Sequence, residues 1–352
     1  MEHVVVALDV GGTGMKCALV HPDGTVRHEE RHPTRADRGP GAVTENILAV
    51  AEGLTEKART EGLTPIAVGI GVPGLVDEAA GVAVWSANIG FRDVPLRELA
   101  TQRLGLPVAL GHDMRAAALA EARLGAGRSR SHVLFVGIGT GIAGGLIVDG
   151  TGYAGAHGAA GELGHLVVRP GGTECGCGLR GCLEAEASAK AVGRRYANLS
   201  GEPGATAFDV ATRAAAGEEL AGQVWQEAVE ALADGLLAAQ ALYDVHAIVL
   251  GGGLAEAGEH LIGPVRRALE RRVTFHRTPE IIRAELGDTA GCRGAALLAL
   301  DTLKAAASPI AASSPSSPSS PGSPSSPGSP SSPGSPGTAG VPSPGGSPGT
   351  ML

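Results

Sequence analysis

The sequence of 352 residues predicts an α/β fold, and two patterns carry that prediction. Short apolar runs rich in β-branched residues alternate with longer segments whose apolar residues recur at helical spacing. Gly-rich turns follow several of the strand-like runs, and glycine is about twice as common as in an average protein even without the C-terminal segment. This excess requires a backbone reason, because glycine is the residue that permits tight turns and close approach of a ligand.

The first third of the chain predicts strands joined by short turns and covered by helices. An apolar run at 4–10 predicts a buried strand, and a Gly-rich turn leads from it into a second strand at 15–20. Together they predict a hairpin. Further strands are predicted at 25–32, 65–72 and 106–110, and helices at 42–61 and 114–124.

The opening hairpin has a counterpart later in the chain. A strand at 132–138, a Gly-Thr-Gly turn and a strand at 144–148 repeat the same pattern. One interpretation is an internal duplication in which two Gly-Thr turns face each other across one ligand. The alternative is that any two hairpins of an α/β protein look alike.

The second half of the chain is more helical, and its longest segment has two interpretations. Helices are predicted at 185–199, 205–216, 220–243, 258–272 and 291–303, and strands at 247–250 and 280–284. The 220–243 helix is apolar enough to form an interface between subunits, although ordinary burial in the core explains the same pattern.

Composition excludes several classes of protein. The segment 308–352 is almost wholly Ser, Pro and Gly, so we expect a disordered extension that adds nothing to the core. A net charge of −8 without a basic cluster argues against nucleic acid as a partner, and no apolar run is long enough to predict a membrane span. Five cysteines without a signal peptide favour the reducing cytoplasm.

Asp9 ends the first strand and begins the first candidate site. The turn that follows, Gly11-Gly12-Thr13, allows backbone N–H groups to approach phosphate oxygens. A carboxylate at that point is suited to holding a hydrated Mg²⁺ ion. The spacing matches neither a Walker A loop nor a dinucleotide fingerprint, and an ordinary hairpin turn explains the pattern about as well.

The strongest local signal is a set of metal-ligand residues in a Gly-rich loop. His165, Cys175, Cys177 and Cys182 follow the pattern His-x9-Cys-x-Cys-x4-Cys. One imidazole and three thiolates fit a closed tetrahedral zinc site, which is structural because it leaves no open position. Such a site would stabilise a loop that has almost no core of its own.

Carboxylates flank this loop and also follow a strand elsewhere. Zinc bound to the loop would hold Glu162 and Glu184 near each other, where carboxylates can accept hydrogen bonds from a polyhydroxylated ligand. His112 and Asp113 stand between a predicted strand and helix. Asp113 at this junction is either a helix N-cap or a catalytic group beyond the carboxyl end of a strand.

Together these motifs resemble the ROK family of bacterial sugar kinases and repressors. The resemblance extends from about residue 4 to residue 303 and rests on four motifs. The turn at 9–13 is similar to the family's first phosphate motif, 137–145 to its second, and 250–258 to its adenosine motif. The segments 161–165 and 175–182 are similar to its signature and zinc loop.

The resemblance implies an actin-like ATPase (ribonuclease H-like) fold, in which two α/β domains flank a cleft that binds ATP with Mg²⁺ and a hexose. Residues 1–113 with 292–307 would form the small domain and 114–291 the large one. Asp113 would be the general base for the sugar 6-hydroxyl. The sugar contacts would be Asn88, His112, Asp113, Glu162, His165 and Glu184. The ATP contacts would be Asp9, Gly11, Gly12, Thr13, Gly139, Thr140, Gly141, Gly251, Gly252 and Gly253.

One departure from the family pattern bears on the substrate. The family's kinases usually carry Asn before the catalytic Asp, whereas this chain has His112. Glucose is the expected hexose, with N-acetylglucosamine, N-acetylmannosamine or another amino sugar as alternatives. A sugar-binding regulator without catalysis is a further alternative. A family repressor is not expected, because no DNA-binding region precedes Asp9, and the family pattern implies a homodimer or homotetramer.

Overall fold

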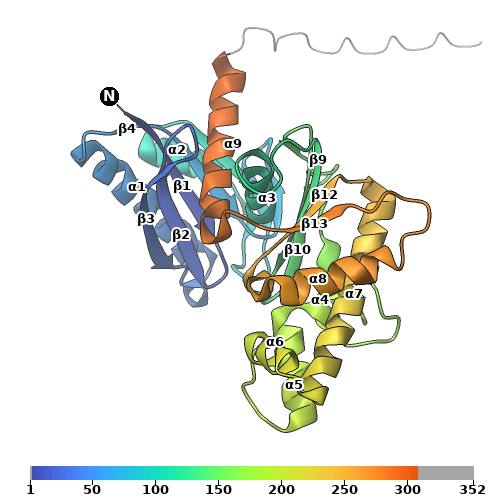
Figure 1. Ribbon diagram of the computed structural model, residues 1–352. Helices are drawn as coiled ribbons and strands as arrows, with labels where there is room; N and C mark the ends of the chain where they lie inside the picture. The colour runs from blue at the N-terminus through green and yellow to red at the C-terminus, as the bar shows by residue number, and fades with distance from the viewer. Residues whose placement is uncertain (1, 308–352) are drawn as a thin grey trace, which may run out of the picture. The chain divides into compact units, whose positions relative to one another are not determined.

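The computed structural model describes residues 2–307 (Figure 1). The predicted disordered segment 308–352 lies outside the described residues. Strands and helices alternate along the chain, so the α/β prediction is confirmed. Among the described residues, no helix is both long and apolar enough to span a membrane.

The first sheet has five strands in the order β3-β2-β1-β4-β8. Its strands are β1 (His3–Val10), β2 (Gly14–Val20), β3 (Val26–Pro33), β4 (Thr64–Val72) and β8 (Val108–His112). The first three strands pair in antiparallel fashion, whereas β4 and β8 run parallel to β1. Carboxyl ends of the parallel strands therefore meet at one edge, which brings Asp9 opposite Gly71 and places His112 two strands from β1.

The second sheet repeats this topology in the order β11-β10-β9-β12-β13. Its strands are β9 (His132–Ile138), β10 (Ile142–Val148), β11 (Thr151–Gly152), β12 (Ala247–Gly251) and β13 (Glu280–Arg283). Here too an antiparallel hairpin is followed by two strands parallel to its first strand. The same strand order in both sheets supports internal duplication over the chance likeness of two hairpins.

Helices cover both faces of the first sheet because its strands alternate their buried side chains. Val4, Val6 and Leu8 pack in a core with α1 (Pro40–Thr60) and α2 (Leu96–Leu104). Val5 and Ala7 point the other way and pack against α9 (Ala290–Ala307).

Two helices pack against each other at short range, as Figure 1 shows for α3 (Asp113–Arg123) and α9. A Cβ atom at Gly294 of α9 would lie 1.8 Å from the carbonyl oxygen of Ala116 in α3, so only glycine fits there. On its other side α3 packs on Phe135 and Val133 of β9. The pair α3 and α9 thus joins the two sheets.

The remaining helices build the largest core against the second sheet. They are α4 (Leu183–Ala187), α5 (Ala189–Ser200), α6 (Ala207–Ala215), α7 (Glu219–Tyr243) and α8 (Glu259–Glu270). Helix α7 contributes buried residues along its whole length, including Val224, Leu232 and Leu236. Core burial therefore accounts for the apolar pattern of the predicted 220–243 helix.

Two features differ from the sequence-based expectation. The predicted helix 185–199 is broken at Ser188, whose hydroxyl caps α5 by accepting from the Ala191 N–H. A small sheet of β5 (Leu75–Asp77), β6 (Val82–Trp85) and β7 (Arg92–Val94) was not expected. The predicted domain boundaries stay a prediction, although the strands of each large sheet fall within one predicted domain.

Candidate active site

The first Gly-Thr turn connects β1 to β2 and is fixed by backbone bonds. The Gly11 N–H donates to the Gly14 carbonyl at 2.9 Å. Thr34, just beyond β3, donates its hydroxyl to the Gly11 carbonyl at 2.6 Å and its N–H to the Thr13 carbonyl at 3.0 Å. The acceptors in these bonds are backbone carbonyl groups, and Gly11 is the only residue of the turn whose N–H has an acceptor among the described residues. The N–H groups of Gly12 and Thr13 therefore stay available for a ligand.

Asn88 lies beside this turn, in the segment between β6 and β7. A Cβ atom at Gly12 would lie 3.1 Å from the Asn88 Cβ, so the two residues are neighbours. Asn88 is exposed, and it makes no hydrogen bond to any other described residue. Its side-chain amide is thus free to contact a ligand next to the first turn.

Asp9 is half-buried near the end of β1 and points at the start of α9. A Cβ atom at Gly291 would lie 2.1 Å from Asp9 Oδ2. Burial raises the pKa of the Asp9 carboxyl, Lys16 opposes that shift, and Asp288 adds to it. Lys16 pairs with Asp288 at 3.0 Å. The carboxylate is thus positioned to balance a cation that approaches the turn.

The second Gly-Thr turn connects β9 to β10 and is tied to the segment beyond the cysteine loop. Its Gly139 N–H donates to the Gly141 carbonyl at 2.9 Å. The Gly139 carbonyl accepts from the Ala189 N–H at the start of α5, also at 2.9 Å. The Ile142 N–H donates to Glu184 Oε2 at 2.9 Å. The break at Ser188 therefore brings the N-terminus of α5 to this turn.

Asp113 is the first residue of α3, and His112 rather than Asp113 is the N-cap of that helix. The N-cap interpretation of Asp113 is thereby removed. Burial, together with the charges of Asp9 and Glu162, raises the pKa of the Asp113 carboxyl to about 7. A carboxyl group with that pKa can accept a proton near neutral pH, as a general base must.

His112 is buried, and both of its polar sides face neighbours. Its Nδ1 accepts from the Arg115 N–H at 3.4 Å, which leaves the proton on Nε2. Nε2 lies 3.6 Å from Asp113 Oδ1. Burial and the Arg115 charge lower the pKa of the imidazole to about 3, so His112 is neutral at working pH. The only group it can offer a ligand is the Nε2–H donor.

The four predicted metal ligands converge as the sequence pattern requires. The ligand atoms of His165, Cys175, Cys177 and Cys182 lie within 4.8 Å of one another. Cys175 Sγ lies 3.7 Å from His165 Nδ1, and Cys177 Sγ lies 3.7 Å from Cys182 Sγ. Tetrahedral zinc with Zn–S bonds of about 2.3 Å separates its ligand atoms by about 3.5–3.8 Å. The donor set and its geometry fit Zn²⁺.

Glu162 stands three residues before His165 and is exposed. It begins the 3-10 helix η2 (Leu163–His165), and the preceding Gly161 accepts from the Gly144 N–H at 2.9 Å. The negative charge of Glu162 contributes to the raised pKa of Asp113. Nδ1 of His165 points to Cys175, so Nε2 is the ring nitrogen left for a ligand.

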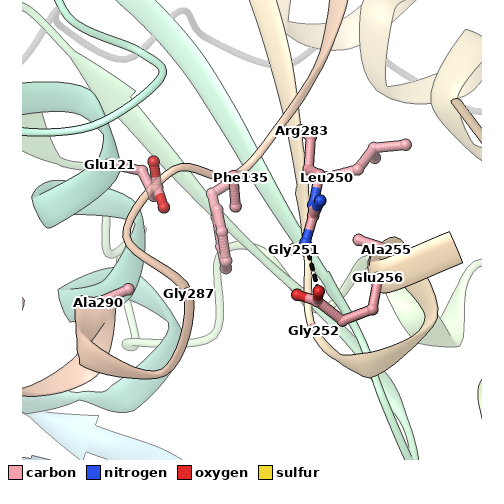
Figure 2. Close-up of a pocket in the computed structure, with 11 residues that line it drawn as sticks. Glu121, Phe135, Leu250, Gly251, Gly252, Ala255, Glu256, Arg283, Gly287 and Ala290 are labelled. Carbon is pink, nitrogen blue, oxygen red and sulfur yellow. Dashed lines mark hydrogen bonds and ion pairs between the residues drawn. The ribbon is translucent and has the colours of Figure 1, made fainter. Parts of the chain in front are cut away.

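The third glycine motif lines a small pocket at the end of β12. Gly252 has φ +80°, and a Cβ atom there would lie 2.6 Å from the Ile138 carbonyl oxygen, so only glycine fits. Figure 2 shows Gly251 and Gly252 beside an ion pair between Arg283 and Glu256. This pocket reaches the start of α9 through Ala290. Its Gly-rich wall is suited to a flat ring such as adenine.

Three charged residues near these sites gave no signal in the sequence. Arg115 is buried and paired with Glu78, which lies in the turn between β5 and β6. Glu121 is fully buried and accepts from the Ala126, Glu285 and Leu286 N–H groups. Glu121 therefore ties α3 to the segment that leads into α9 and the pocket of Figure 2. The sequence-level signal that could have found Arg115 and Glu121 is a charged residue within an otherwise Ala-rich helix.

These features define a class of protein. Two sheets of one topology, joined by α3 and α9 and each with a Gly-Thr turn, form the actin-like ATPase fold that the family resemblance implied. Residues 5–302 match the ROK family. The chain therefore belongs to the ROK family.

Individual relatives are sugar kinases. Glucokinase from Thermotoga maritima is 34% identical over 308 residues, which cover 83% of this chain and 96% of the relative. N-acetylmannosamine kinase from Citrobacter koseri is 33% identical over 296 residues, with coverage of 84% and 98%. A solved ROK family glucokinase from Streptomyces griseus, in complex with glucose and AMPPNP, is 31% identical with a TM-score of 0.74 and coverage of 85% and 99%.

Proposed function

We propose that this chain is an ATP-dependent hexose kinase that phosphorylates the 6-hydroxyl of glucose. One observation carries the proposal: Asp113 stands at the start of α3, directly after the carboxyl end of β8, and burial together with the charges of Asp9 and Glu162 raises its pKa to about 7. A base is thus combined with a carboxylate at a phosphate turn and another beside the metal loop. The glucokinases among its relatives point to the same reaction.

Asp113 is the base of the proposed reaction. Its carboxylate accepts the proton of the 6-hydroxyl as the oxygen attacks the γ-phosphorus, and the bond to the β-phosphate oxygen breaks to release ADP. The neutral His112 beside it does not compete for that proton, because its pKa is about 3. Closure of the cleft over the bound sugar would exclude water from the carboxylate and so limit hydrolysis of ATP.

The two Gly-Thr turns and Asp9 serve the phosphates. The N–H groups of 12–13 and 140–141, which are not used within the turns, would donate to phosphate oxygens, and the Gly251–Gly253 turn would border adenosine. Mg²⁺ bound with ATP neutralises charge on the transferred group. Asp9 would hold the water shell of that ion, and the start of α9 keeps the carboxylate in place.

The sugar would be held by four side chains from three segments. Glu162 and Glu184 would accept from hydroxyls, Asn88 would donate or accept beside Gly12, and His165 would use Nε2. Zinc held by His165, Cys175, Cys177 and Cys182 would fix the loop that connects them and supply no further chemistry. Because Cys182 directly precedes α4, the metal would also set the place of Glu184.

His112 favours an amino sugar as the second candidate substrate. Its ring offers a lone Nε2–H donor, which would suit the carbonyl oxygen of an N-acetyl group. The N-acetylmannosamine kinases among the relatives are consistent with this alternative. N-acetylglucosamine is the other member of this class that the chain would be tested on.

A coupled ADP-release assay over a panel of hexoses tests the proposal. The wild-type chain should release ADP with glucose or, failing that, with one of the N-acetylated sugars. Asp113→Asn should lower kcat by about 10²–10⁴-fold while sugar binding persists. If no hexose stimulates ADP release, the kinase proposal is wrong, and a sugar-binding regulator takes its place.

The location and assembly of the enzyme remain predictions. None of the five cysteines, all of which lie among the described residues, forms a disulfide, and we propose the cytoplasm as the location from the number of cysteines and the sequence alone. A homodimer or homotetramer is proposed from the family pattern alone, and sedimentation analysis would test it.

A further inference from the structure

Arg115, two residues after the proposed base Asp113 in α3, forms a partly buried ion pair with Glu78. Arg115 of α3 is 3% exposed, and Glu78 in the turn between β5 and β6 is 32% exposed. Arg115 donates to Glu78 Oε1 twice, from Nε at 3.0 Å and from Nη2 at 2.8 Å. The cost of removing a buried arginine from water largely offsets the attraction within its ion pair, so such a pair adds little to stability. The pair therefore needs another reason to be present.

The same Glu78 oxygen also holds the residue before the base. The His112 N–H donates to Glu78 Oε1 at 3.2 Å, so one carboxylate oxygen accepts three N–H groups. The His112 ring in turn accepts from the Arg115 N–H through Nδ1. His112 is therefore held through its backbone by Glu78 and through its ring by Arg115, with Asp113 between the two anchored residues.

Arg115 reaches a second segment with its remaining nitrogen. Nη1 donates to the Gly158 carbonyl at 2.9 Å. Gly158 lies between β11 and Glu162, and a Cβ atom there would be 2.5 Å from the Val76 carbonyl oxygen of β5. The guanidinium thus joins the start of α3 and the β5–β6 turn to the segment that carries Glu162. A lysine could not do this, because it lacks the planar fork of donors.

We propose that Arg115 and Glu78 are a positioning pair that fixes the Asp113 carboxylate against the segment carrying Glu162. This inference rests on the proposed kinase function. Neither residue touches a reacting atom, so both act through His112, Asp113 and the Glu162 segment. The pair sets the distance between the group that accepts the proton and the group that holds the sugar.

The charges around Asp113 give the pair a measurable signature. Asp9 from β1 and Glu162 raise the pKa of Asp113, and Arg115 lowers it. His112 is neutral, and Glu78 faces Arg115 directly. Removing the Arg115 charge should raise the pKa of Asp113, whereas removing the Glu78 charge leaves Arg115 less neutralised and should lower it.

Steady-state kinetics of four variants of the full chain test the proposal, with whichever hexose gives turnover in the wild type. Arg115→Met should reduce kcat about 10–100-fold and raise the sugar KM, while the KM for ATP stays close to that of the wild type. Arg115→Lys keeps the charge but loses the fork, so its kcat should fall without a shift of the acid limb. The apparent pKa below which kcat/KM falls, which marks the acid limb of the pH profile, should rise in Arg115→Met and fall in Glu78→Gln, each by roughly half a pH unit.

Arg123→Met is the matched control. Arg123 lies on the same helix and also combines an ion pair, with Asp301, and a bond to a loop carbonyl, that of Gly150. Its loss should lower the melting temperature and leave kcat and the acid limb unchanged. The proposal is overturned if Arg123→Met reproduces the kinetic losses of Arg115→Met. It is also overturned if the acid limbs of Arg115→Met and Glu78→Gln shift in the same direction or do not shift.

Should Arg115→Met not fold, Arg115→Lys and Glu78→Gln decide the matter. A folded Arg115→Lys with wild-type kcat would refute the positioning role. Absence of turnover in the wild type with every hexose would instead refute the proposed function, so the two failures are distinct.

Discussion

Glu184 Oε2 accepts a hydrogen bond of 2.9 Å from the Ile142 N–H, so a carboxylate expected to bind sugar also holds the second Gly-Thr turn, which we propose binds phosphate. The carboxylate also packs tightly against the backbone of the turn, because a Cβ atom at Gly141 would lie 2.3 Å from the same oxygen. Glu184 follows Cys182 by two residues. The metal loop, the proposed sugar site and the phosphate turn are thereby connected through one side chain.

This double role predicts different effects for two substitutions of Glu184. Glu184→Gln keeps a carbonyl oxygen that can accept from Ile142, so the KM for ATP should stay nearly unchanged while the KM for sugar rises. Glu184→Ala loses both bonds, so the KM for ATP should rise as well, by about 10-fold or more, since a hydrogen bond to a charged group contributes roughly 1.5–3 kcal/mol. Steady-state kinetics with each substrate varied in turn measure the difference, and equal KM values for ATP in the two variants would refute it.

The raised pKa of Asp113 predicts how activity depends on pH. The group must be deprotonated to act as base, so kcat/KM for the sugar should fall about tenfold per pH unit below about 7. A carboxyl group with an ordinary pKa of 3.8 would give a flat profile there. A pH–rate profile from pH 5 to 9 is the measurement, and a rate independent of pH down to 5 contradicts the assignment of the base.

The same pKa predicts that Asp113 costs the fold stability. Because its pKa is about 7 when folded and 3.8 ordinarily, the cost is fully present above pH 7 and is relieved as the pH falls toward 3.8. Asp113→Asn should therefore raise the free energy of unfolding at pH 8, by on the order of 1–3 kcal/mol, and change it little at pH 4. Urea denaturation at both pH values checks this, and a destabilised variant at pH 8 would count against the burial of the charge.

Zinc removal should weaken sugar binding more than nucleotide binding. Cys177 is exposed, so Cys177→Ser disturbs no packing and tests the metal alone. We expect zinc content below one per chain and a sugar KM raised more than the KM for ATP, because the loop carries His165 and precedes Glu184. Cys17→Ala is the control, since Cys17 is buried in β2 away from the ligand set and should keep its zinc. Equal loss for both substrates would contradict the role given to the loop.

The sequence predicted those parts of the fold whose signal is local. The strand at 132–138 agrees with β9 residue for residue, because an apolar β-branched run bounded by turns has only one interpretation. The convergence of His165, Cys175, Cys177 and Cys182 was equally clear, since three cysteines within one short Gly-rich loop predict a shared site. Both signals are complete within a few neighbouring residues.

Relationships between distant segments were beyond the reach of the sequence. Ser188 interrupts an Ala-rich helical pattern because the Ala189 N–H is taken by Gly139, fifty residues earlier in the chain. The Arg115–Glu78 pair likewise depends on how β8 and the β5–β6 turn meet. The three strands of the small sheet are short, and short strands carry too few residues for a periodic pattern.

Gly291 offers the most direct test of the place given to Asp9. A Cβ atom there would lie 2.1 Å from Asp9 Oδ2 and 2.9 Å from Asp9 Cβ, so Gly291→Ala must displace either the carboxylate or the start of α9. We expect kcat/KM for ATP to fall at least about tenfold, and the Mg²⁺ concentration for half-maximal rate to rise, because Asp9 would no longer face the ion's water shell. The effect should be specific to the nucleotide side, with the sugar KM nearly unchanged.

Gly53→Ala in α1 is the control that separates this steric effect from helix propensity. A Cβ atom at Gly53 meets nothing within 4 Å, so alanine should stabilise the chain by roughly 0.5–1 kcal/mol and leave the kinetics unchanged. Gly291→Ala gains the same intrinsic propensity, so any loss of activity arises from the contact with Asp9. If the two variants behave alike in kinetics and in melting temperature, Asp9 does not depend on the start of α9, and its role at the phosphate turn must be assigned anew.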